Sequence, residues 1–480
     1  MVEHLVILSD LKMGDVKFGT SGARGLVSDL TPQVCYAFIQ AFLRSTSPDG
    51  NYVYVGHDLR PSSPSIAQFC IQAILDSGFK PVYVGEVPTP ALALRCIKAC
   101  AKGIMITGSH IPFDRNGLKF YTAGGEILKE DEVAIMATEL FLPEKFYPTP
   151  LPPIDASCKS DYESRYVNWF GRGALSGMKI GVYEHSSVAR DPLKMILSQL
   201  GANVVSLLPS NDFIPIDTEA FRKEDVDAGM QWAEQFGFDA ICSTDGDGDR
   251  PMFADETGKW LRGDLIGVLC AKYIGANAIC TPVSSNTAVE KTNFFKIVTR
   301  TKVGSPYVIE AMNALLMSVE NVVAGYEANG GFLLGSQLIE GDAVLDKLPT
   351  RDALLPMLTL LVEANKTSLP LSNLFTHLPS RFTSSDRLQN INMNSVKSLL
   401  LDLASDLSLA GDFLVGDQKA VCDLNLIDGL RFTMCDGSVV HLRPSGNAPE
   451  LRCYTEADTE IEANQLCQNS LSKLSLRLCL

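Results

Sequence analysis

Residues 52–84 read YVYVGHDLRPSSPSIAQFCIQAILDSGFKPVYV. The apolar run 52–56 predicts a buried strand, because it is short and rich in β-branched and aromatic residues. Residues 65–77 have helical spacing and end before Gly78, where a glycine commonly terminates a helix. The run 81–84 predicts a second strand. A strand, a helix and a strand in this order predict a mostly parallel sheet with helices on both faces.

The same rhythm continues on both sides of this stretch. Thr31 and Pro32 predict a helix start, with a capping side chain followed by a proline in the first turn. Residues 103–106 predict another strand. The proline-rich stretch 147–153 predicts a linker, and strand and helix patterns resume at residues 178–183.

A third repetition begins near Asp264, and its last helix is predicted from Arg351 to Ala364. The remainder differs in character and ends in a helix-like segment rich in serine and leucine. We therefore predict an α/β protein with three doubly wound mixed α/β domains and a smaller C-terminal α+β domain. The expected domain limits are 1–150, 151–257, 258–367 and 368–480.

Composition excludes several classes of function. The formal net charge is −15 over 480 residues, which disfavours nucleic-acid binding. No apolar run is long enough for a membrane helix, and the N-terminus has no secretory cleavage pattern, so we expect a cytoplasmic protein. The 13 cysteines form no C-x-x-C pair, which argues against a zinc ribbon or a thioredoxin-type site. We expect reduced cysteines that serve as small core residues, including Cys35, Cys70, Cys96, Cys242 and Cys270.

The loop after the strand 103–106 carries the first candidate site, because open α/β sheets bind ligands beyond the carboxyl ends of their strands. Gly108 permits a sharp turn that leaves the hydroxyl of Ser109 projecting. A serine is a weak nucleophile unless a base or metal assists it, and His110 and Lys119 are the local candidates. By itself this loop could equally be an ordinary polar turn.

The second candidate is the loop Asp245–Gly–Asp247–Gly–Asp249. Three carboxylates at alternate positions repel one another unless a hard divalent cation binds them, and all-oxygen ligation suits Mg²⁺ or Ca²⁺. An EF-hand is an alternative, since Glu256 stands at the twelfth position, but Arg250 replaces the glycine required at the sixth. A solvated acidic turn is the other alternative. We predict a metal site.

Three further stretches are weaker signals alone. Residues 325–331, GYEANGG, offer Glu and Asn for sugar hydroxyls. Residues 443–450, RPSGNAPE, combine an arginine, a hydroxyl and a glycine amide as an anion-binding turn. Residues 18–25, FGTSGARG, form a similar loop. Each could also be a structural turn.

Together and in this order, the five stretches resemble the α-D-phosphohexomutase superfamily, and most closely its phosphomannomutase and phosphoglucomutase members. The resemblance covers the whole chain. It implies four domains around a central cleft and a Mg²⁺-dependent enzyme that carries a phosphoserine. We expect a hexose phosphate substrate and a hexose 1,6-bisphosphate intermediate, and no protein partner, nucleic acid or membrane.

The resemblance also implies roles for single residues. Ser109 would carry the phosphoryl group, and one of its phosphate oxygens would join Asp245, Asp247 and Asp249 around Mg²⁺. The residues expected around the reacting atoms are Arg24, His110 and Lys119. The residues expected to bind the remainder of the substrate are Arg250, Lys302, Glu327, Asn329, Arg443, Ser445, Gly446 and Asn447.

The departures from the family pattern bear on sugar preference. Many relatives have Asn where Ile111 stands, and Thr where Asn447 stands. We expect a phosphomannomutase, with phosphoglucomutase or phosphoglucosamine mutase as alternatives. Two other classes remain open: a Mg²⁺-dependent phosphatase, which would need no second phosphate site, and a non-catalytic sugar-phosphate-binding protein.

Overall fold

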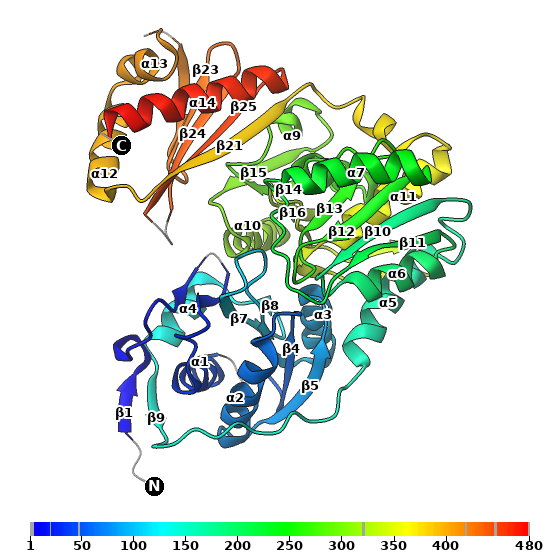
Figure 1. Cartoon of the computed structure of the whole chain (residues 1–480), viewed down its shortest axis with the longest axis vertical. Coiled ribbons are helices and arrows are strands. Elements are labelled where there is room, and N and C mark those ends of the chain that lie inside the picture. Colours follow the sequence, from blue (N-terminus) through cyan, green and yellow to red (C-terminus); the bar gives the residue numbers. More distant parts are fainter. Residues whose placement is uncertain are drawn as a thin grey trace. The chain divides into compact units, whose positions relative to one another are not determined.

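The computed structural model describes residues 4–19, 21–46, 49–318, 322–417, 420–445 and 449–478 (Figure 1). The chain forms two compact units, which are described separately. The first consists of Met1–Ile279 and Gly304–Thr376, and the second of Cys280–Val303 and His377–Leu480. Across these described ranges, no helix combines the length and apolarity that a membrane crossing requires. The four expected domain limits stay predictions.

The first sheet of unit 1 has the strand order β2-β3-β7-β6-β4-β5, with β8 paired to β7. Its strands are β2 Lys17–Phe18, β3 Ala23–Leu26, β4 Tyr52–His57, β5 Lys80–Glu86, β6 Lys102–Ile106, β7 Arg115–Thr122 and β8 Gly125–Glu126. β4 is parallel to β5 and β6, whereas β7 is antiparallel to both β6 and β3. The sheet is therefore mixed. The expectation of a mostly parallel sheet holds for β4, β5 and β6 and is wrong for β7, β3 and β2, which pair antiparallel.

Helices cover both faces of this sheet. Alternate apolar residues of β4, β6 and β7 form one core with α1 (Pro32–Ser45) and α2 (Ser63–Asp76). As predicted, Thr31 caps α1, and its Oγ1 accepts a hydrogen bond from the Val34 N–H at 3.3 Å. On the opposite face, α3 (Thr89–Ala99) approaches β6 so closely that a Cβ on Gly103 would lie 2.3 Å from the Cys96 sulfur. This residue must therefore be glycine.

The remaining elements near this sheet are short. They are β1 His4–Ile7, η1 Leu8–Asp10, α4 Lys129–Met136 and β9 Glu139–Leu142, with β1 and β9 paired antiparallel. The second sheet of unit 1 has the order β11-β10-β12-β13. Its elements are α5 Ser157–Phe170, β10 Lys179–His185, α6 Arg190–Gln199, β11 Asn203–Pro209, α7 Lys223–Phe236, β12 Ala240–Thr244 and β13 Pro251–Ala254. β12 ends directly before the predicted metal loop.

The third group of unit 1 contains strands β16, β17 and β20, paired antiparallel in that order. Its elements are α8 Gly263–Tyr273, α10 Ser305–Ser318, β16 Val323–Tyr326, β17 Phe332–Leu334, β18 Leu338–Glu340, β19 Ala343–Leu345, β20 Leu348–Asp352, α11 Leu354–Thr367 and η2 Leu371–Phe375. Arg351 was predicted to begin the last helix, but it lies in β20. The helix begins later, at Leu354, because Leu348–Asp352 form strand β20, which pairs with β17; Asp352 Oδ1 also accepts a hydrogen bond from the Leu354 N–H at 3.0 Å.

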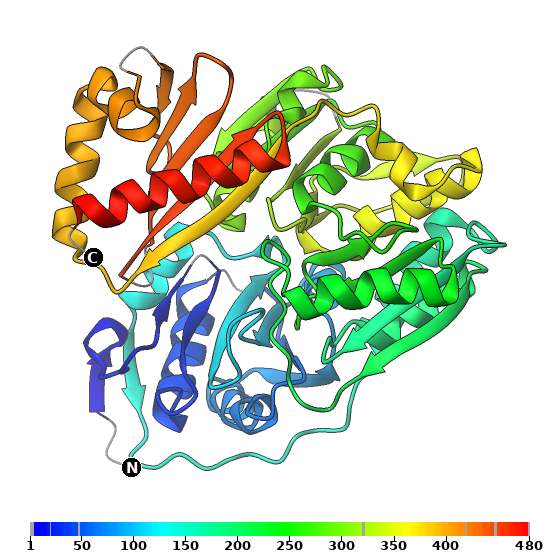
Figure 2. The ribbon, with the colours of Figure 1, turned by 45° about the horizontal axis from the view of Figure 1, so that its top comes forward.

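Unit 2 contains a five-stranded antiparallel sheet in the order β21-β25-β24-β23-β22. Its elements are α9 Ala288–Lys291, β15 Ile297–Thr301, β21 Phe382–Gln389, α12 Met393–Ser405, α13 Leu407–Val415, β22 Val421–Asn425, β23 Leu430–Met434, β24 Val439–Pro444, β25 Glu450–Ala457 and α14 Glu460–Arg477. α14 lies across β21 and β25 (Figure 2). The C-terminal helix and the α+β character of this region were predicted. The individual strands were not placed, since most of β21 and β22 is exposed or half-buried and has no apolar run.

Residues of the segment Cys280–Val303 are bound to this C-terminal part. The side-chain amide of Asn286 donates to the Arg381 carbonyl at 2.8 Å, and the Thr287 N–H donates to Glu456 Oε2 at 3.1 Å. β14 (Ala278–Pro282) begins in unit 1 and ends in unit 2. The segment Cys280–Val303 therefore belongs to the same compact unit as residues His377–Leu480, although the chain on either side of it belongs to unit 1.

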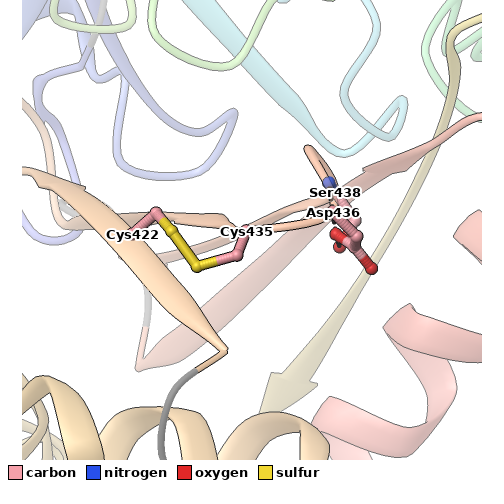
Figure 3. The surroundings of a disulfide bond; sticks show 4 residues. All are labelled: Cys422, Cys435, Asp436 and Ser438. Atoms are coloured by element: carbon pink, nitrogen blue, oxygen red, sulfur yellow. Dashed lines mark hydrogen bonds between the residues drawn. A yellow bond between two sulfur atoms is a disulfide. The ribbon is translucent and has the colours of Figure 1, made fainter.

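The expectation that all cysteines are reduced is wrong for one pair. Cys422 and Cys435 form a disulfide at the open end of the β22–β23 hairpin (Figure 3). Their Cα atoms are 5.1 Å apart, which is within the range that a disulfide spans. Antiparallel pairing brings the two together, and no sequence motif indicates it. The five cysteines named from the sequence are buried free thiols, as expected.

Candidate active site

Ser109 follows β6 and sits in a strained, buried turn. Its φ is +53°, a left-handed conformation that non-glycine residues seldom adopt, and its side chain is fully buried. The Thr107 hydroxyl accepts a hydrogen bond from the Ser109 N–H at 2.7 Å. The Ser109 hydroxyl donates to Asp245 Oδ2 at 2.8 Å and lies 3.3 Å from His110 Nδ1. Strain at such a position is frequent in functional sites.

Arg60, which the sequence analysis missed, holds this turn in place. Its guanidinium donates to four backbone carbonyls of the serine loop, those of Ser109, Ile111, Pro112 and Arg115, at 2.5–2.9 Å. Asp58 pairs with Arg60 Nε at 3.2 Å and accepts the Thr107 hydroxyl at 2.7 Å. Both residues follow β4, whose carboxyl end is at the same edge of the sheet as that of β6. Because two neighbouring parallel strands end at the same sheet edge, the residues that follow β4 could have been predicted to lie beside the serine loop.

Asp245, Asp247 and Asp249 follow β12 and converge. One carboxylate oxygen from each lies within 4.8 Å of the others, and at most 1% of each residue is exposed. Oδ1 of Asp247 and Oδ1 of Asp249 are buried and accept no hydrogen bond from any residue that the structure describes. Buried carboxylate oxygens without a donor are costly, so the arrangement suits a hard cation bound by oxygen. The site fits a divalent metal ion.

Two buried cations occupy the other oxygens of this cluster. Lys119 Nζ donates to Asp247 Oδ2 at 2.6 Å and to Asp249 Oδ2 at 2.7 Å. Arg351 donates to the same Asp249 oxygen from Nε at 3.0 Å and from Nη2 at 2.9 Å. Lys119 and Arg351 thereby orient these two carboxylates with Oδ1 left for a metal. Arg351 was missed because the sequence pattern placed it in a helix.

The charges of the cluster shift the pKa values of its members. Burial, followed by repulsion from Asp247 and Asp249, raises the pKa of Asp245 well above its usual value. Burial also acts to raise the pKa of Asp247, but Lys119 outweighs it and the pKa is lowered. A bound cation would relieve the repulsion among the three carboxylates.

Beside Ser109, by contrast, the positive charges of arginine side chains lower the pKa values of their neighbours. Burial and the nearby Arg250 and Arg24 hold the pKa of His110 well below its usual value, so its imidazole is neutral at neutral pH. Burial, followed by Arg250 and Arg351, lowers the pKa of Arg24 to about 10, so Arg24 keeps its charge. The Nε groups of Arg24 and Arg250 are buried and make no hydrogen bond to a described residue, although Arg250 Nε lies 3.7 Å from Asp249 Oδ1. These are donors available to an anion.

The loop after β16 places Glu327 and Asn329 in the same unit. Glu327 Oε2 accepts a hydrogen bond from Arg351 Nη1 at 3.0 Å, so Arg351 joins Glu327 to the metal loop. Asn329 Oδ1 accepts from the Gly331 N–H at 2.9 Å and shapes its own turn. Both side chains are nearly buried. The structure therefore brings together these predicted residues of unit 1: Arg24, Ser109, His110, Lys119, Asp245, Asp247, Asp249, Arg250 and Glu327, with Asn329 two positions further along the loop that carries Glu327.

The other predicted residues belong to unit 2 and are described with it. Lys302 directly follows β15 and is exposed. Arg443 lies in β24 and its Nε donates to Asp428 Oδ2 at 2.8 Å, while Ser445 follows the strand. Gly446 and Asn447 lie outside the described residues.

Comparison with known proteins gives four family matches along the chain. Models of the phosphoglucomutase/phosphomannomutase α/β/α domains I, II and III match residues 15–140, 162–258 and 262–382. The model of the phosphoglucomutase/phosphomannomutase C-terminal domain matches residues 403–471. Three α/β/α domains followed by a C-terminal domain confirm the predicted fold class.

Individual relatives cover nearly the whole chain. A phosphomannomutase of Salmonella muenchen is 46% identical over 96% of this chain and 96% of its own length. A phosphomannomutase of Sinorhizobium fredii is 43% identical over 96% of this chain and 98% of its own length. A solved phosphoglucomutase/phosphomannomutase family protein from Burkholderia thailandensis has the same fold, with a TM-score of 0.71, 20% identity and coverage of 95% and 97%.

Proposed function

The chain belongs to the phosphoglucomutase/phosphomannomutase family, and from this premise we propose that it interconverts mannose 6-phosphate and mannose 1-phosphate. It is an isomerase of the phosphohexomutase class. The mannose substrate follows from the two relatives at 46% and 43% identity, both of which are phosphomannomutases. Glucose and glucosamine phosphates are the alternative substrates. A cytoplasmic location is part of this proposal.

The metal proposed is Mg²⁺. Asp245, Asp247 and Asp249 would hold it with a phosphate oxygen on Ser109, since hard oxygen ligands and phosphate suit this ion. When bound, it would offset negative charge on the phosphoryl group and on the three carboxylates. The two partnerless Oδ1 atoms of Asp247 and Asp249 support this assignment.

The proposed reaction has two phosphoryl transfers. In the first, the bond between phosphorus and Ser109 Oγ breaks while a hydroxyl oxygen of the sugar phosphate forms a new bond to phosphorus, which gives a hexose 1,6-bisphosphate. The hydroxyl proton ends on Ser109 Oγ. In the second, the other phosphate returns to Ser109 and releases the isomeric monophosphate. Neutral His110, 3.3 Å from Oγ, is placed to relay this proton.

The other side chains position substrate and offset charge. Phosphoryl transfer is catalysed mainly by orientation and charge stabilisation. Arg24 and Lys119 would flank the transferred group, and Arg250 would donate to a substrate oxygen. Glu327 and Asn329 would bind sugar hydroxyls. Lys302, Arg443 and Ser445, with Gly446 and Asn447, would hold the phosphate that is not reacting.

One observation carries the proposal. The Ser109 hydroxyl is 2.8 Å from Asp245 in a buried cluster of three carboxylates, and in the same unit Arg24 and Arg250 each have a buried Nε that makes no hydrogen bond to a described residue. A serine beside a carboxylate cluster could also serve a phosphatase. A phosphatase has no need for a second set of phosphate-binding residues such as Arg443 and Ser445.

The test is a product assay with Mg²⁺, a trace of hexose 1,6-bisphosphate and either mannose 1-phosphate, glucose 1-phosphate or glucosamine 1-phosphate. We expect isomerisation, fastest with mannose 1-phosphate, and no release of inorganic phosphate. Phosphate release without isomerisation would instead establish a phosphatase, and the absence of both a binding protein.

We also predict that Ser109→Ala abolishes turnover without unfolding the protein. Ala removes the only atom that carries the phosphoryl group, whereas the turn is still held by the Arg60 contacts to backbone carbonyls. Turnover and the thermal unfolding midpoint would be measured on the same preparation. A turnover rate within threefold of that of the wild-type enzyme would refute the proposal that Ser109 carries the phosphoryl group.

A further inference from the structure

The turn between β22 and β23, residues 426–429, is fixed against β24. Gly429 has a φ of +81°, and a Cβ at this position would lie 2.4 Å from the Leu442 carbonyl oxygen and 3.0 Å from the Arg443 Cα atom. Asn425 Oδ1 accepts a hydrogen bond from the Ile427 N–H at 2.9 Å and shapes the start of the turn. The turn therefore contacts the strand at the residue expected to bind phosphate.

Asp428, in this turn, is bound to β24 through both its backbone and its side chain. Its carbonyl oxygen accepts a hydrogen bond from His441 Nε2 at 2.6 Å, and its carboxylate Oδ2 accepts one from Arg443 Nε at 2.8 Å. Residues two apart on a strand point to the same face, so Asp428 contacts one face of β24 at two points. This arrangement restricts the Arg443 side chain to one orientation.

The same carboxylate oxygen has a second partner. Asp428 Oδ2 accepts a hydrogen bond from the Val303 N–H at 2.9 Å. Val303 directly follows Lys302, which lies 141 positions before Arg443 and is also expected, from the family resemblance, to bind substrate. One oxygen thus joins two predicted substrate-binding segments within unit 2.

Resting on the proposed function, we propose that Asp428 is a positioning residue for the site that holds the non-reacting phosphate. It binds Arg443 through Nε, which leaves Nη1 and Nη2 as the donors for phosphate, and it holds the backbone at Val303 beside them. Within the described residues no hydrogen bond engages Nη1 or Nη2 of Arg443. An arginine already held in one orientation loses less freedom when phosphate binds.

A carboxylate near a phosphate also repels it, so the two effects oppose each other. Asp428 and Arg443 are 19% and 12% exposed at their side chains, and water at this depth screens the repulsion of a more distant phosphate. The 2.8 Å ion pair is direct and much less screened. We expect orientation to dominate, and removal of Asp428 to weaken phosphate binding.

The experiment measures binding of mannose 1-phosphate by calorimetry in the full-length Ser109→Ala protein, so that no turnover occurs. In this background, Arg443→Ala tests the phosphate site, and Asp428→Ala tests the positioning. We expect Asp428→Ala to raise Kd about tenfold, as is common when a residue that orients a ligand-binding group is lost. Asp428→Asn, which keeps the shape and one acceptor oxygen but loses the charge that pairs with Arg443, covers the case in which the alanine variant fails to fold, and we expect a rise in its Kd as well.

A double-mutant cycle separates positioning from a purely structural role. If Asp428 acts through Arg443, then Asp428→Ala has no further effect on Kd once Arg443 is already Ala. Asp436→Ala is the matched control, because Asp436 is an exposed turn carboxylate whose hydrogen bonds among the described residues come from Ser438 (Figure 3), and we expect the Kd of this variant to be unchanged.

Three results would overturn the inference. Equal weakening by Asp428→Ala with and without Arg443 would mean a structural role. Unchanged or tighter binding by Asp428→Ala, with Arg443→Ala weakening it, would refute the positioning role and leave the proposed function intact. Unchanged binding in Arg443→Ala, or no binding of mannose 1-phosphate by the Ser109→Ala protein, would refute the assigned phosphate site and the inference with it.

Discussion

The backbone conformation of Ser109 is maintained by residues that take no part in the proposed reaction. Its left-handed backbone is an unfavourable conformation that its surroundings must maintain. The Arg60 guanidinium does this through carbonyls on both sides of the loop, and Phe213 lies 4.0 Å above it. The proposed nucleophile is thus positioned by an arginine that follows another strand.

We predict that Arg60→Lys lowers kcat roughly 100-fold, the cost of a reacting group displaced by about 1 Å. Lysine keeps the positive charge, but a single ammonium cannot serve four carbonyls at once. Steady-state kinetics and the unfolding midpoint would be measured beside Arg44→Lys, an exposed arginine with one carbonyl contact. A kcat within threefold of the unmodified enzyme would contradict this role.

His441 predicts a pH dependence of stability. Burial lowers its pKa from 6.5 to about 4, while its hydrogen bond to the Asp428 carbonyl opposes the shift. The unfolded chain binds the proton more readily, so this contribution is complete above the unfolded pKa and is lost as the pH falls from about 6.5 towards about 4. By pH 5 the loss is about 2 kcal/mol.

The measurement is urea unfolding near pH 7.5 and pH 5 for the unmodified protein and for His441→Gln. The variant should lose about 2 kcal/mol less between the two pH values, because glutamine does not titrate. An equal loss in both proteins would contradict a buried, neutral His441.

At the scale of elements, close packing decides where the loops lie. α3 rests on β6 at Gly103, with no space for a side chain. Thr89, the first residue of α3, donates its hydroxyl to Asp247 Oδ2 at 2.7 Å. The position of this helix on the first sheet therefore fixes one carboxylate of the metal loop, which follows a strand of the second sheet.

The β22–β23 hairpin predicts a redox-dependent stability. The Cys422–Cys435 disulfide closes a short loop with a sequence separation of 13, and such a bond typically stabilises by about 3 kcal/mol. Reduction should therefore lower the unfolding midpoint of the unmodified protein. The double variant Cys422→Ser/Cys435→Ser should show the lower midpoint with or without the reducing agent. If the unfolding midpoint of the wild-type protein is the same with and without the reducing agent, the disulfide is refuted.

At the scale of the whole molecule, the first unit combines chemistry from three sheets. Ser109 follows a strand of the first sheet, and the three aspartates of the proposed metal site follow a strand of the second. Arg351 lies in β20, in the third group of strands. A cation at this point would bind to the folded unit and not to the unfolded chain. Metal binding should therefore stabilise the unit as a whole.

We predict that Mg²⁺ raises the unfolding midpoint of the unmodified protein, corresponding to about 2.7 kcal/mol at a concentration of 100 Kd. EDTA should reverse the shift and abolish turnover. Asp247→Asn should lose most of the Mg²⁺ effect, because it removes one of the three converging carboxylates. Asp239→Asn, which changes a carboxylate beside β12 and outside the cluster, should keep it.

The sequence alone was sufficient wherever the information is local. The alternation of strands and helices, the cap at Thr31 and the acidic loop after β12 were predicted from neighbouring residues. The expectation failed where pairing partners are distant. Arg351 was assigned to a helix, the individual strands of the C-terminal sheet were not placed, and Cys422 and Cys435 were taken for free thiols.

Residue types and their order along the chain therefore indicated a serine loop, an acidic loop and a distant arginine turn as the proposed site. Only the tertiary structure decided that Arg60 holds the serine, that Arg351 links Asp249 to Glu327, and that Asp428 links Val303 to Arg443. The physical reason is that an ion pair or a hydrogen bond needs its two atoms within about 3 Å. Sequence separation places no limit on such a contact, because chain folding sets that distance.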